Sequence, residues 1–331
     1  MTSGRPDDDT IRAALALAVR APSIHNSQPW LWRVGDEAVH LYADTGRHLP
    51  FTDPARRELV LSCGVALQHF TVALAALGWQ THVHRLPNPA DPDHLASVEI
   101  CGQTGSEQDI ALAAAIPRRR TDRRWYSSWP VPAGDIAMMA ARAARSGVTL
   151  RRVESPRSLG AVLSRAMHKH GSDADYLAEL AMWSGRYGSV AGVPARNTPT
   201  VSGHPGPPAR AFANPALAQA HGAQARDDAG VVLVLGTATD DTLARLRAGE
   251  ATGVVLLTAT ALGLSSCPLT EPLEIADTRD AVRRLALDAD GFPQMLMRIG
   301  WAPLNADPLP ATPRRPLTEV VSRLDGAPIG M

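Results

Sequence analysis

The sequence predicts an α+β fold that is built from two half-domains. Its 331 residues exceed what one compact core usually holds, so about two units are expected. Apolar segments with helical spacing alternate with short segments of extended character. One long apolar helix pattern also occurs twice, at residues 64–78 and 249–263. We therefore assign residues 1–108 to the first half and residues 109–331 to the second.

Local patterns define the elements of the first half. Pro22 ends a helix near the start of the chain, Gly35 and Asp36 form the turn of a hairpin, and Gly78 ends a long helix. The predicted elements are, in order, a helix over 10–20, a hairpin over 30–42, an apolar helix over 54–77, and strands over 80–86 and 97–101.

The second half shows the same kinds of pattern around one irregular stretch. Residues 185–215 are rich in proline and glycine without periodicity, so we predict a long surface excursion there. Gly263 closes a long helix, and the Ser-Ser-Cys-Pro sequence that follows it reads as a turn. The predicted elements are helices over 134–145, 158–169 and 242–262, strands over 148–153 and 231–235, and a final strand over 295–301.

The repeated helix pattern has two interpretations. Residues 64–78 and 249–263 each begin and end with glycine, and each leads into an extended segment. Ala66 corresponds to Ala251 in this alignment. Two unrelated buried helices with C-terminal glycines would give the same pattern. Alternatively, the halves are divergent copies of one unit, which would be an internally fused dimer.

Charge and cysteine content exclude several classes of function. The 33 basic and 33 acidic residues cancel, so no overall field attracts a nucleic acid or an anionic membrane. The longest apolar run, residues 253–264, is far shorter than the roughly 20 residues that span a bilayer. Cys63, Cys101 and Cys267 are widely spaced, which argues against a disulfide framework or a zinc site. We expect a cytoplasmic protein with no nucleic-acid or membrane partner.

Residues 20–30, Arg-Ala-Pro-Ser-Ile-His-Asn-Ser-Gln-Pro-Trp, form a polar loop between a predicted helix and strand. Ser23, Asn26 and Gln28 lie between two prolines. Loops of this kind present backbone and amide groups to ligands, and asparagine offers both a donor and an acceptor. The edge of a flavin ring alternates donors and acceptors, so this chemistry suits it. An Asx-turn that caps the strand is the alternative.

Residues 118–126 read Arg-Arg-Arg-Thr-Asp-Arg-Arg-Trp-Tyr. Five arginines and the Thr121 hydroxyl provide fork-shaped donors that suit a phosphate. A solvated charge run and a basic patch for nucleic acid or another partner are the alternatives. Near the C-terminus, prolines flank Arg314 and Arg315, and their fixed backbone lowers the entropy cost of holding a charge at a ligand.

Together these segments resemble the nitroreductase-like FMN-binding proteins, and most closely the mycobacterial Acg family of NAD(P)H nitroreductases of the dormancy response. The resemblance covers residues from about 10 to about 320. Residues 22–30 match a PSxxNxQPW loop, and Arg119, Thr121 and Arg123 match an R-x-[ST]-x-[RK] phosphate motif. Residues 265–270 match the segment beside the flavin ring, and the arginine pair matches a basic tail motif.

The resemblance implies which residues bind the cofactor. Ser23 and Asn26 are expected to meet the flavin ring, and Pro268 and Leu269 to lie against or beside it. The residues expected at the phosphate end are Arg119, Thr121, Arg123 and either Arg314 or Arg315.

The resemblance also implies an arrangement of subunits within one chain. In the family, two identical subunits build each flavin site across their interface. Here the loop motif occurs in the first half and the arginine motif in the second. We therefore expect a nitroreductase-like fold with its two half-domains fused as an internal pseudo-dimer around one FMN, and residues 184–216 as a lid-like insertion. A homodimer of this fused unit is left open.

The implied activity is an NAD(P)H-dependent reduction of nitro compounds, quinones or similar small-molecule electron acceptors. The cofactor supplies the chemistry at flavin N5, so no side chain is expected to act as a catalytic residue. The proline-glycine stretch could close the ring face, and the sequence has no identifiable NAD(P)H-binding motif. A flavin-storing or flavin-sequestering protein with little turnover is therefore the alternative.

Three other features have simpler interpretations. His82 and His84 share one face of a predicted strand, and residues 168–175 contain a group of histidines and aspartates. Metal binding is conceivable, but solvent-facing histidines are expected. Cys267 lies beside the expected flavin segment, where we expect a small buried side chain rather than a redox group.

Overall fold

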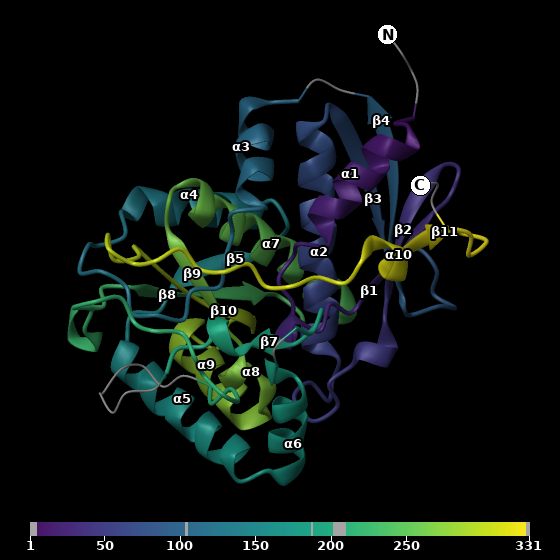
Figure 1. The fold of residues 1–331 in the computed structure, drawn as a ribbon. Helices are drawn as coiled ribbons and strands as arrows, with labels where there is room; N and C mark the ends of the chain where they lie inside the picture. Colours follow the sequence, from purple (N-terminus) through teal and green to yellow (C-terminus); the bar gives the residue numbers. More distant parts are fainter. Residues whose placement is uncertain (1–4, 103–104, 187, 201–209, 329–331) are drawn as a thin grey trace.

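The computed structural model describes residues 5–102, 105–186, 188–200 and 210–328. Two β-sheets lie on either side of a central pair of long helices, α2 (Arg57–Ala76) and α7 (Thr242–Ala261) (Figure 1). The α+β fold class predicted from the sequence is confirmed.

The first sheet consists of five strands in the order β11-β1-β2-β4-β3. Its strands are β1 (Trp30–Val34), β2 (Ala38–Ala43), β3 (Trp79–Arg85), β4 (His94–Gly102) and β11 (Val321–Arg323). The predicted hairpin is confirmed, since Trp30 pairs with Ala43 and Val34 with Val39 in antiparallel register. The last strand, β11, returns from the end of the chain and pairs in parallel with β1.

The second sheet consists of four antiparallel strands in the order β5-β8-β10-β9. Its strands are β5 (Thr149–Arg152), β8 (Val231–Thr237), β9 (Ser265–Leu269) and β10 (Phe292–Gly300). Successive side chains of a strand point to opposite faces. Leu233 and Leu235 of β8 therefore join the core around α2 and α7, whereas Val234 joins a second core on the other face. Both faces of this sheet are covered.

The central helices approach each other closely where two glycines meet. A Cβ atom on Gly64 would lie 2.2 Å from the carbonyl oxygen of Leu246, and one on Gly249 would lie 2.2 Å from the carbonyl oxygen of Leu61. Both helices end before a glycine with positive φ, Gly78 at 86° and Gly263 at 83°. The glycines that mark the repeat in the sequence therefore permit the contact between the helices and end each of them.

The remaining helices cover these layers. Helix α1 packs on α2, helices α3 and α4 pack on α7, and helices α5, α8 and α9 surround the second core. Their bounds, with those of α6, α10 and the short strands β6 and β7, are α1 (Asp8–Ala18), α3 (Glu107–Ala115), α4 (Ala133–Ala144), α5 (Pro156–Gly171), α6 (Ala174–Met182), β6 (Ser184–Arg186), β7 (Val193–Pro194), α8 (Glu271–Glu274), α9 (Ala276–Ala286) and α10 (Leu317–Val320).

Three sequence predictions are wrong. The Ser-Ser-Cys-Pro segment is the edge strand β9 rather than a turn, because an edge strand tolerates the missing N–H of Pro268. Strand β10 is not the final one, since β11 follows it. The stretch over 185–215 is not simply a surface excursion: it contributes β6 and β7, and Ala195 and Asn197 are buried. Residues 187 and 201–209 of that stretch lie outside the described residues.

Helix α2 is also the one helix in the described part of the chain that is long and apolar enough to cross a membrane. In the structure, 78% of its apolar window is buried against other elements. Such burial is typical of a core helix.

Candidate functional site

The loop over residues 20–30 begins where α1 ends and lies against α2. Three of its residues have left-handed backbone conformations: φ is 45° for His25, 53° for Asn26 and 55° for Gln28. Such values are uncommon for residues other than glycine and cluster at functional sites. The Ser23 hydroxyl stabilises the loop by accepting the backbone N–H of Gln28 at 2.9 Å, and the Ile24 N–H donates to the Ser62 hydroxyl of α2.

Asn26 joins three distant segments of the chain. Its amide nitrogen donates to the carbonyl oxygens of Gly192 and Pro313, at 3.1 and 3.2 Å. Its amide oxygen accepts from the Arg314 guanidinium at 3.0 Å. The predicted ring-binding asparagine is therefore buried where the loop, the proline-glycine stretch and the C-terminal segment meet.

The arginine run lies alongside β9 and does not form one continuous patch. Thr121 forms a parallel bridge with Ser266, and the Asp122 N–H donates to the carbonyl oxygen of Ser266. Arg124 pairs with Asp122 at 3.0 Å and Arg118 is exposed. Neighbouring arginines of the run thus serve different purposes.

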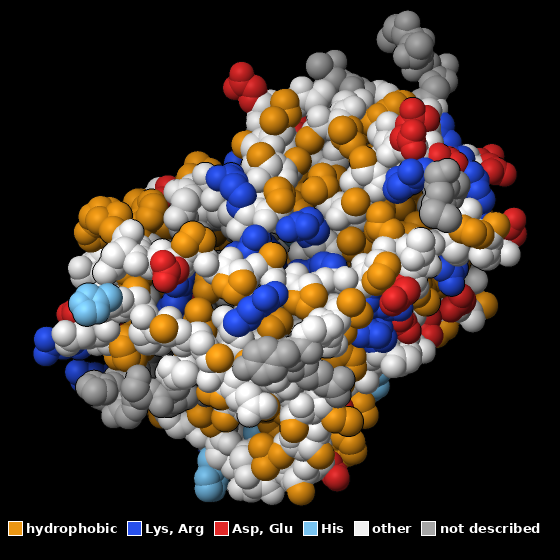
Figure 2. Space-filling model, viewed as in Figure 1, with side chains coloured by type: hydrophobic (Ala, Val, Ile, Leu, Met, Phe, Trp, Pro, Cys, Tyr) orange, Lys and Arg blue, Asp and Glu red, His pale blue; other side chains and the backbone are white. Residues whose placement is uncertain are grey.

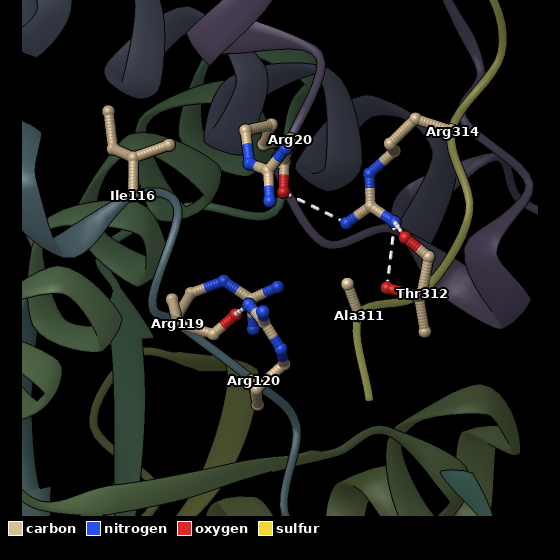
Figure 3. Close-up of a pocket in the computed structure, with 7 residues that line it drawn as sticks. All are labelled: Arg20, Ile116, Arg119, Arg120, Ala311, Thr312 and Arg314. Atoms are coloured by element: carbon tan, nitrogen blue, oxygen red, sulfur yellow. Dashed lines mark hydrogen bonds between the residues drawn. The ribbon is translucent and has the colours of Figure 1, made fainter. Parts of the chain in front are cut away.

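Four arginines from three segments line one small cavity (Figure 3). Arg20 follows α1, Arg119 and Arg120 follow α3, and Arg314 belongs to the segment that leads to β11. Figure 3 shows the four side chains converging on a common space, with Ile116, Ala311 and Thr312 around them. Basic side chains also gather along the middle of this face in Figure 2, where the C-terminal segment crosses the molecule in Figure 1.

No acidic side chain of the described residues pairs with the arginines of this cavity. Within the described residues, the side chains of Arg20, Arg119, Arg120 and Arg314 donate to carbonyl, amide and hydroxyl oxygens but form no salt bridge. The Nε atoms of Arg20, Arg119 and Arg314 are buried and make no hydrogen bond. Burial, followed by the neighbouring arginines, lowers the pKa of Arg119 to about 10 and that of Arg314 to about 9. This arrangement suits an anion, whose charge would compensate that of the arginines.

The two arginines of the tail have different environments. The Arg314 guanidinium donates to the carbonyl oxygens of Arg20 and Ala21, at 2.9 and 3.0 Å, and lines the cavity. Arg315 instead pairs with Asp44 at 3.0 Å. Of the two tail residues predicted for the phosphate end, Arg314 lines the cavity, whereas Arg315 is held by Asp44 outside its lining.

Arg123 also lies away from the cavity. Its guanidinium donates to the carbonyl oxygen of Asn197 at 3.3 Å and lies 4.9 Å from the ring centroid of Phe212. The Phe212 ring in turn packs edge-on against His25, at 5.7 Å between centroids. Phe212 therefore lies between Arg123 and His25 of the loop, whose neighbours Ser23 and Asn26 were predicted to bind the ring.

Pro268 and Leu269 lie at the end of the edge strand β9, opposite Met297 and Leu296 of β10. Cys267, beside them, is buried as predicted, and burial raises the pKa of its thiol. Thr270 follows and precedes the short helix α8. Arg210 contacts both Thr270 and His25, and Phe212 contacts His25, so the 23–26 loop, the end of β9 and the Arg210–Phe212 segment border one region.

Sequence reasoning missed a buried ionic cluster beside this region. Arg210 donates to Glu274 and to the Thr270 hydroxyl, and lies 4.0 Å from Glu271. His170 pairs with Glu271 at 3.2 Å and stacks on Tyr176. The prediction that the histidines of residues 168–175 face solvent is wrong for His170, which α5 directs into the molecule. No periodicity in the proline-rich stretch indicated Arg210, and nothing in the sequence linked it to α8.

Arg20 and Arg120 were also missed as cavity residues. Arg20 lies in the loop over residues 20–30 and Arg120 in the arginine run, but neither is one of the positions that define the family motifs. Only the tertiary structure brings them to Arg119 and Arg314.

Comparisons with known proteins extend this description. A profile of the nitroreductase family matches residues 116–301. A Mycobacterium tuberculosis H37Rv protein named "Putative NAD(P)H nitroreductase Rv3131" is 59% identical over 321 residues, which cover 97% of this chain and 93% of the relative. The H37Rv protein named "Putative NAD(P)H nitroreductase acg" is 37% identical, with 94% of this chain and 95% of the relative covered. The FMN-dependent nitroreductase NfnB of Mycobacterium smegmatis, solved with NADPH, is 17% identical with a TM-score of 0.39, covering 64% of this chain and 97% of that one.

The family match includes the arginine motif and β9, and the two tuberculosis relatives extend over nearly the whole chain. The resemblance predicted from the loop, the arginine motif and the tail is confirmed. The chain belongs to the nitroreductase family.

Proposed function

We propose that this chain binds FMN and uses NAD(P)H to reduce nitro compounds or quinones. The observation that carries the proposal is the cavity of four arginines, none of which pairs with an acidic side chain in the described part of the chain. Holding several buried cations together is costly unless an anion compensates them. The phosphate of FMN would supply that charge, and the names of the relatives point to the same class of enzyme.

The residues around the cavity fit the phosphate end of the cofactor. Arginine forks suit the oxygens of a phosphate, and Thr312 and Thr121 offer hydroxyl donors close by. We assign Arg20, Arg119, Arg120 and Arg314 to this end. Ser23, Asn26, Arg123, Pro268 and Leu269 are assigned to the ring end, because they adjoin His25, Phe212 or Thr270, which the Arg210–Phe212 segment brings together.

When bound, FMN supplies a carrier of two electrons between NAD(P)H and the acceptor. In the overall reaction, NAD(P)H and one proton convert a nitro compound to a nitroso compound and water, leaving NAD(P)+. The chain binds and orients the cofactor through its arginines and Asn26. The Arg210–Phe212 segment limits the access of water and acceptors to the ring region.

The paired central helices support a single site in a fused pseudo-dimer. The loop comes from the half over 1–108 and the arginine motif from the half over 109–331, and α2 and α7 pack together between them. Strand β11 crosses back to the first sheet, so the halves share the C-terminal segment. Association of two such chains remains a proposal. So does a cytoplasmic location, which three unpaired cysteines support.

Steady-state oxidation of NADH and NADPH by the purified FMN-loaded chain tests the proposal. We expect turnover with a nitroarene or a quinone. Bound FMN that neither nucleotide reduces would contradict the oxidoreductase and leave the flavin-storing alternative. A chain that binds no FMN would contradict both.

A further inference from the structure

The Arg210 guanidinium fills a pocket that is acidic on one side. Glu271 and Glu274 of α8 face its guanidinium together with the Thr270 hydroxyl. On the other side, His25 Nε2 lies 3.0 Å from Arg210 Nη1. The Arg210 side chain is 8% exposed and that of Glu274 is fully buried. The Arg210 guanidinium, which comes from a segment distant in sequence, is therefore surrounded by buried polar groups in the way that a bound ligand would be.

His25 offers this guanidinium a neutral wall. Burial, followed by Arg210, Arg123 and His170, lowers the pKa of His25 well below its ordinary range. Because a guanidinium only donates hydrogen bonds, His25 Nε2 must be the acceptor and the ring proton must sit on Nδ1. His25 Nε2 can therefore accept a hydrogen bond from an N–H group of another cation bound in the position of the Arg210 guanidinium.

The acidic side of the pocket has a carboxylate oxygen that can accept a further hydrogen bond. Glu274 Oε2 is buried and accepts no hydrogen bond within the described residues, although His170 Nε2 lies 3.9 Å from it. Burial opposes the charge of Arg210, but Glu274, Tyr176 and Glu271 raise its pKa overall. The pocket thus favours a cation despite its low exposure.

The location of the pocket connects it with the proposed reaction. Thr270 directly follows Pro268 and Leu269 of the ring end, and His25 lies between Ser23 and Asn26. We propose that the pocket of His25, Thr270, Glu271 and Glu274 recognises the cationic group of an aromatic electron acceptor, which takes the place of the Arg210 guanidinium. This inference rests on the proposed function for its substrate, but the pocket itself can be tested without turnover.

The first test measures binding to the flavin-free chain. R210A and R210Q vacate the pocket, and circular dichroism establishes whether they fold. Benzamidine, an aromatic amidinium, should raise the Tm of both variants, whereas neutral benzamide should not. Adding E274Q to either variant should remove the benzamidine effect. Equal responses to the two compounds would overturn the proposal, as would two variants that fold neither alone nor with methylguanidinium.

The second test measures selectivity in the FMN-loaded chain. 4-Nitrobenzylamine, 4-nitrobenzyl alcohol and 4-nitrobenzoate share one reacting group and differ in charge. In R210A we expect kcat/KM for the amine to rise at least about tenfold more than for the alcohol, and the benzoate to gain least, as charge-assisted hydrogen bonds predict. The F212A control opens the same region but leaves Arg210 against Glu271 and Glu274, so it should not raise kcat/KM for the amine above that for the alcohol.

The outcomes separate this inference from the proposed function. If the chain binds no FMN, the proposed function fails while the benzamidine test still applies. If FMN-loaded R210A reduces all three nitro compounds without charge preference, the proposed function stands and the cationic pocket is refuted.

Discussion

Replacing Arg119 with methionine should affect stability and cofactor binding in opposite directions. Arg119 is 5% exposed, and its one side-chain hydrogen bond to a described residue is a long contact of 3.5 Å to the Thr121 hydroxyl. Burial and its arginine neighbours lower its pKa from 12.5 to about 10. At ~1.4 kcal/mol for each tenfold change in proton affinity, the charged form costs the flavin-free fold about 3 kcal/mol. Methionine fills similar space without the charge.

We therefore expect flavin-free R119M to unfold at a Tm several degrees above that of the wild type. The same variant should bind FMN about 10- to 150-fold more weakly, because a hydrogen bond to a charged group contributes about 1.5–3 kcal/mol. Scanning fluorimetry of the flavin-free protein and titration of flavin fluorescence measure the two effects. R118M is the matched control: Arg118 is exposed and donates to the Ala114 carbonyl oxygen, so both quantities should change by less than ~0.5 kcal/mol.

A loss of stability in flavin-free R119M would refute this reasoning, because it would mean that something within the chain already compensates the Arg119 charge. Unchanged FMN affinity would refute the assignment of Arg119 to the phosphate end.

Three further predictions concern the flavin-free chain. Inorganic pyrophosphate should raise the Tm of the wild type but not of R119M; no response in the wild type would argue against an anion site. Burial raises the pKa of Glu58 from 4.5 to about 8, so the folded state holds a proton there that the unfolded state has lost. Stability should fall as pH rises from about 4.5 to 8, and E58Q should flatten that fall in urea titrations; an identical slope would contradict the assignment. Gly64→Ala places a Cβ 2.2 Å from the Leu246 oxygen and should destabilise the fold by ~1–3 kcal/mol, whereas Gly160→Ala in α5 meets open space and should stabilise it by about 0.5–1 kcal/mol; equal Tm shifts would exclude the helix contact as the cause.

Local patterns in the sequence predicted the regular elements of this fold well. Helix α7 and the hairpin of β1 and β2 follow from periodicities and turn residues that lie within a few positions of each other. Strand β11 could not be predicted, because three residues gain their strand character only by pairing with β1 from the other end of the chain. Strand β9 was misread because serine and proline favour turns unless a neighbouring strand pairs with them.

For the candidate site too, residues in local motifs could be predicted from the sequence, whereas residues that depend on distant contacts could not. The loop around Asn26 and the motif residue Arg119 were identifiable because their spacing matches a family pattern. The different surroundings of Arg314 and Arg315 were not, because they depend on Asp44, which lies far away in sequence. Arg210 gave no signal, since its partners in α8 are distant in sequence and its own neighbours show no periodicity.

The number of FMN molecules bound by each chain tests the central claim most directly. FMN released by denaturation can be quantified against the concentration of the purified, FMN-saturated protein. One FMN for each 331-residue chain is the predicted result, because we propose that the loop and the arginine cavity belong to a single site between the two halves. A chain that retains no FMN, or one that binds two, would contradict the account.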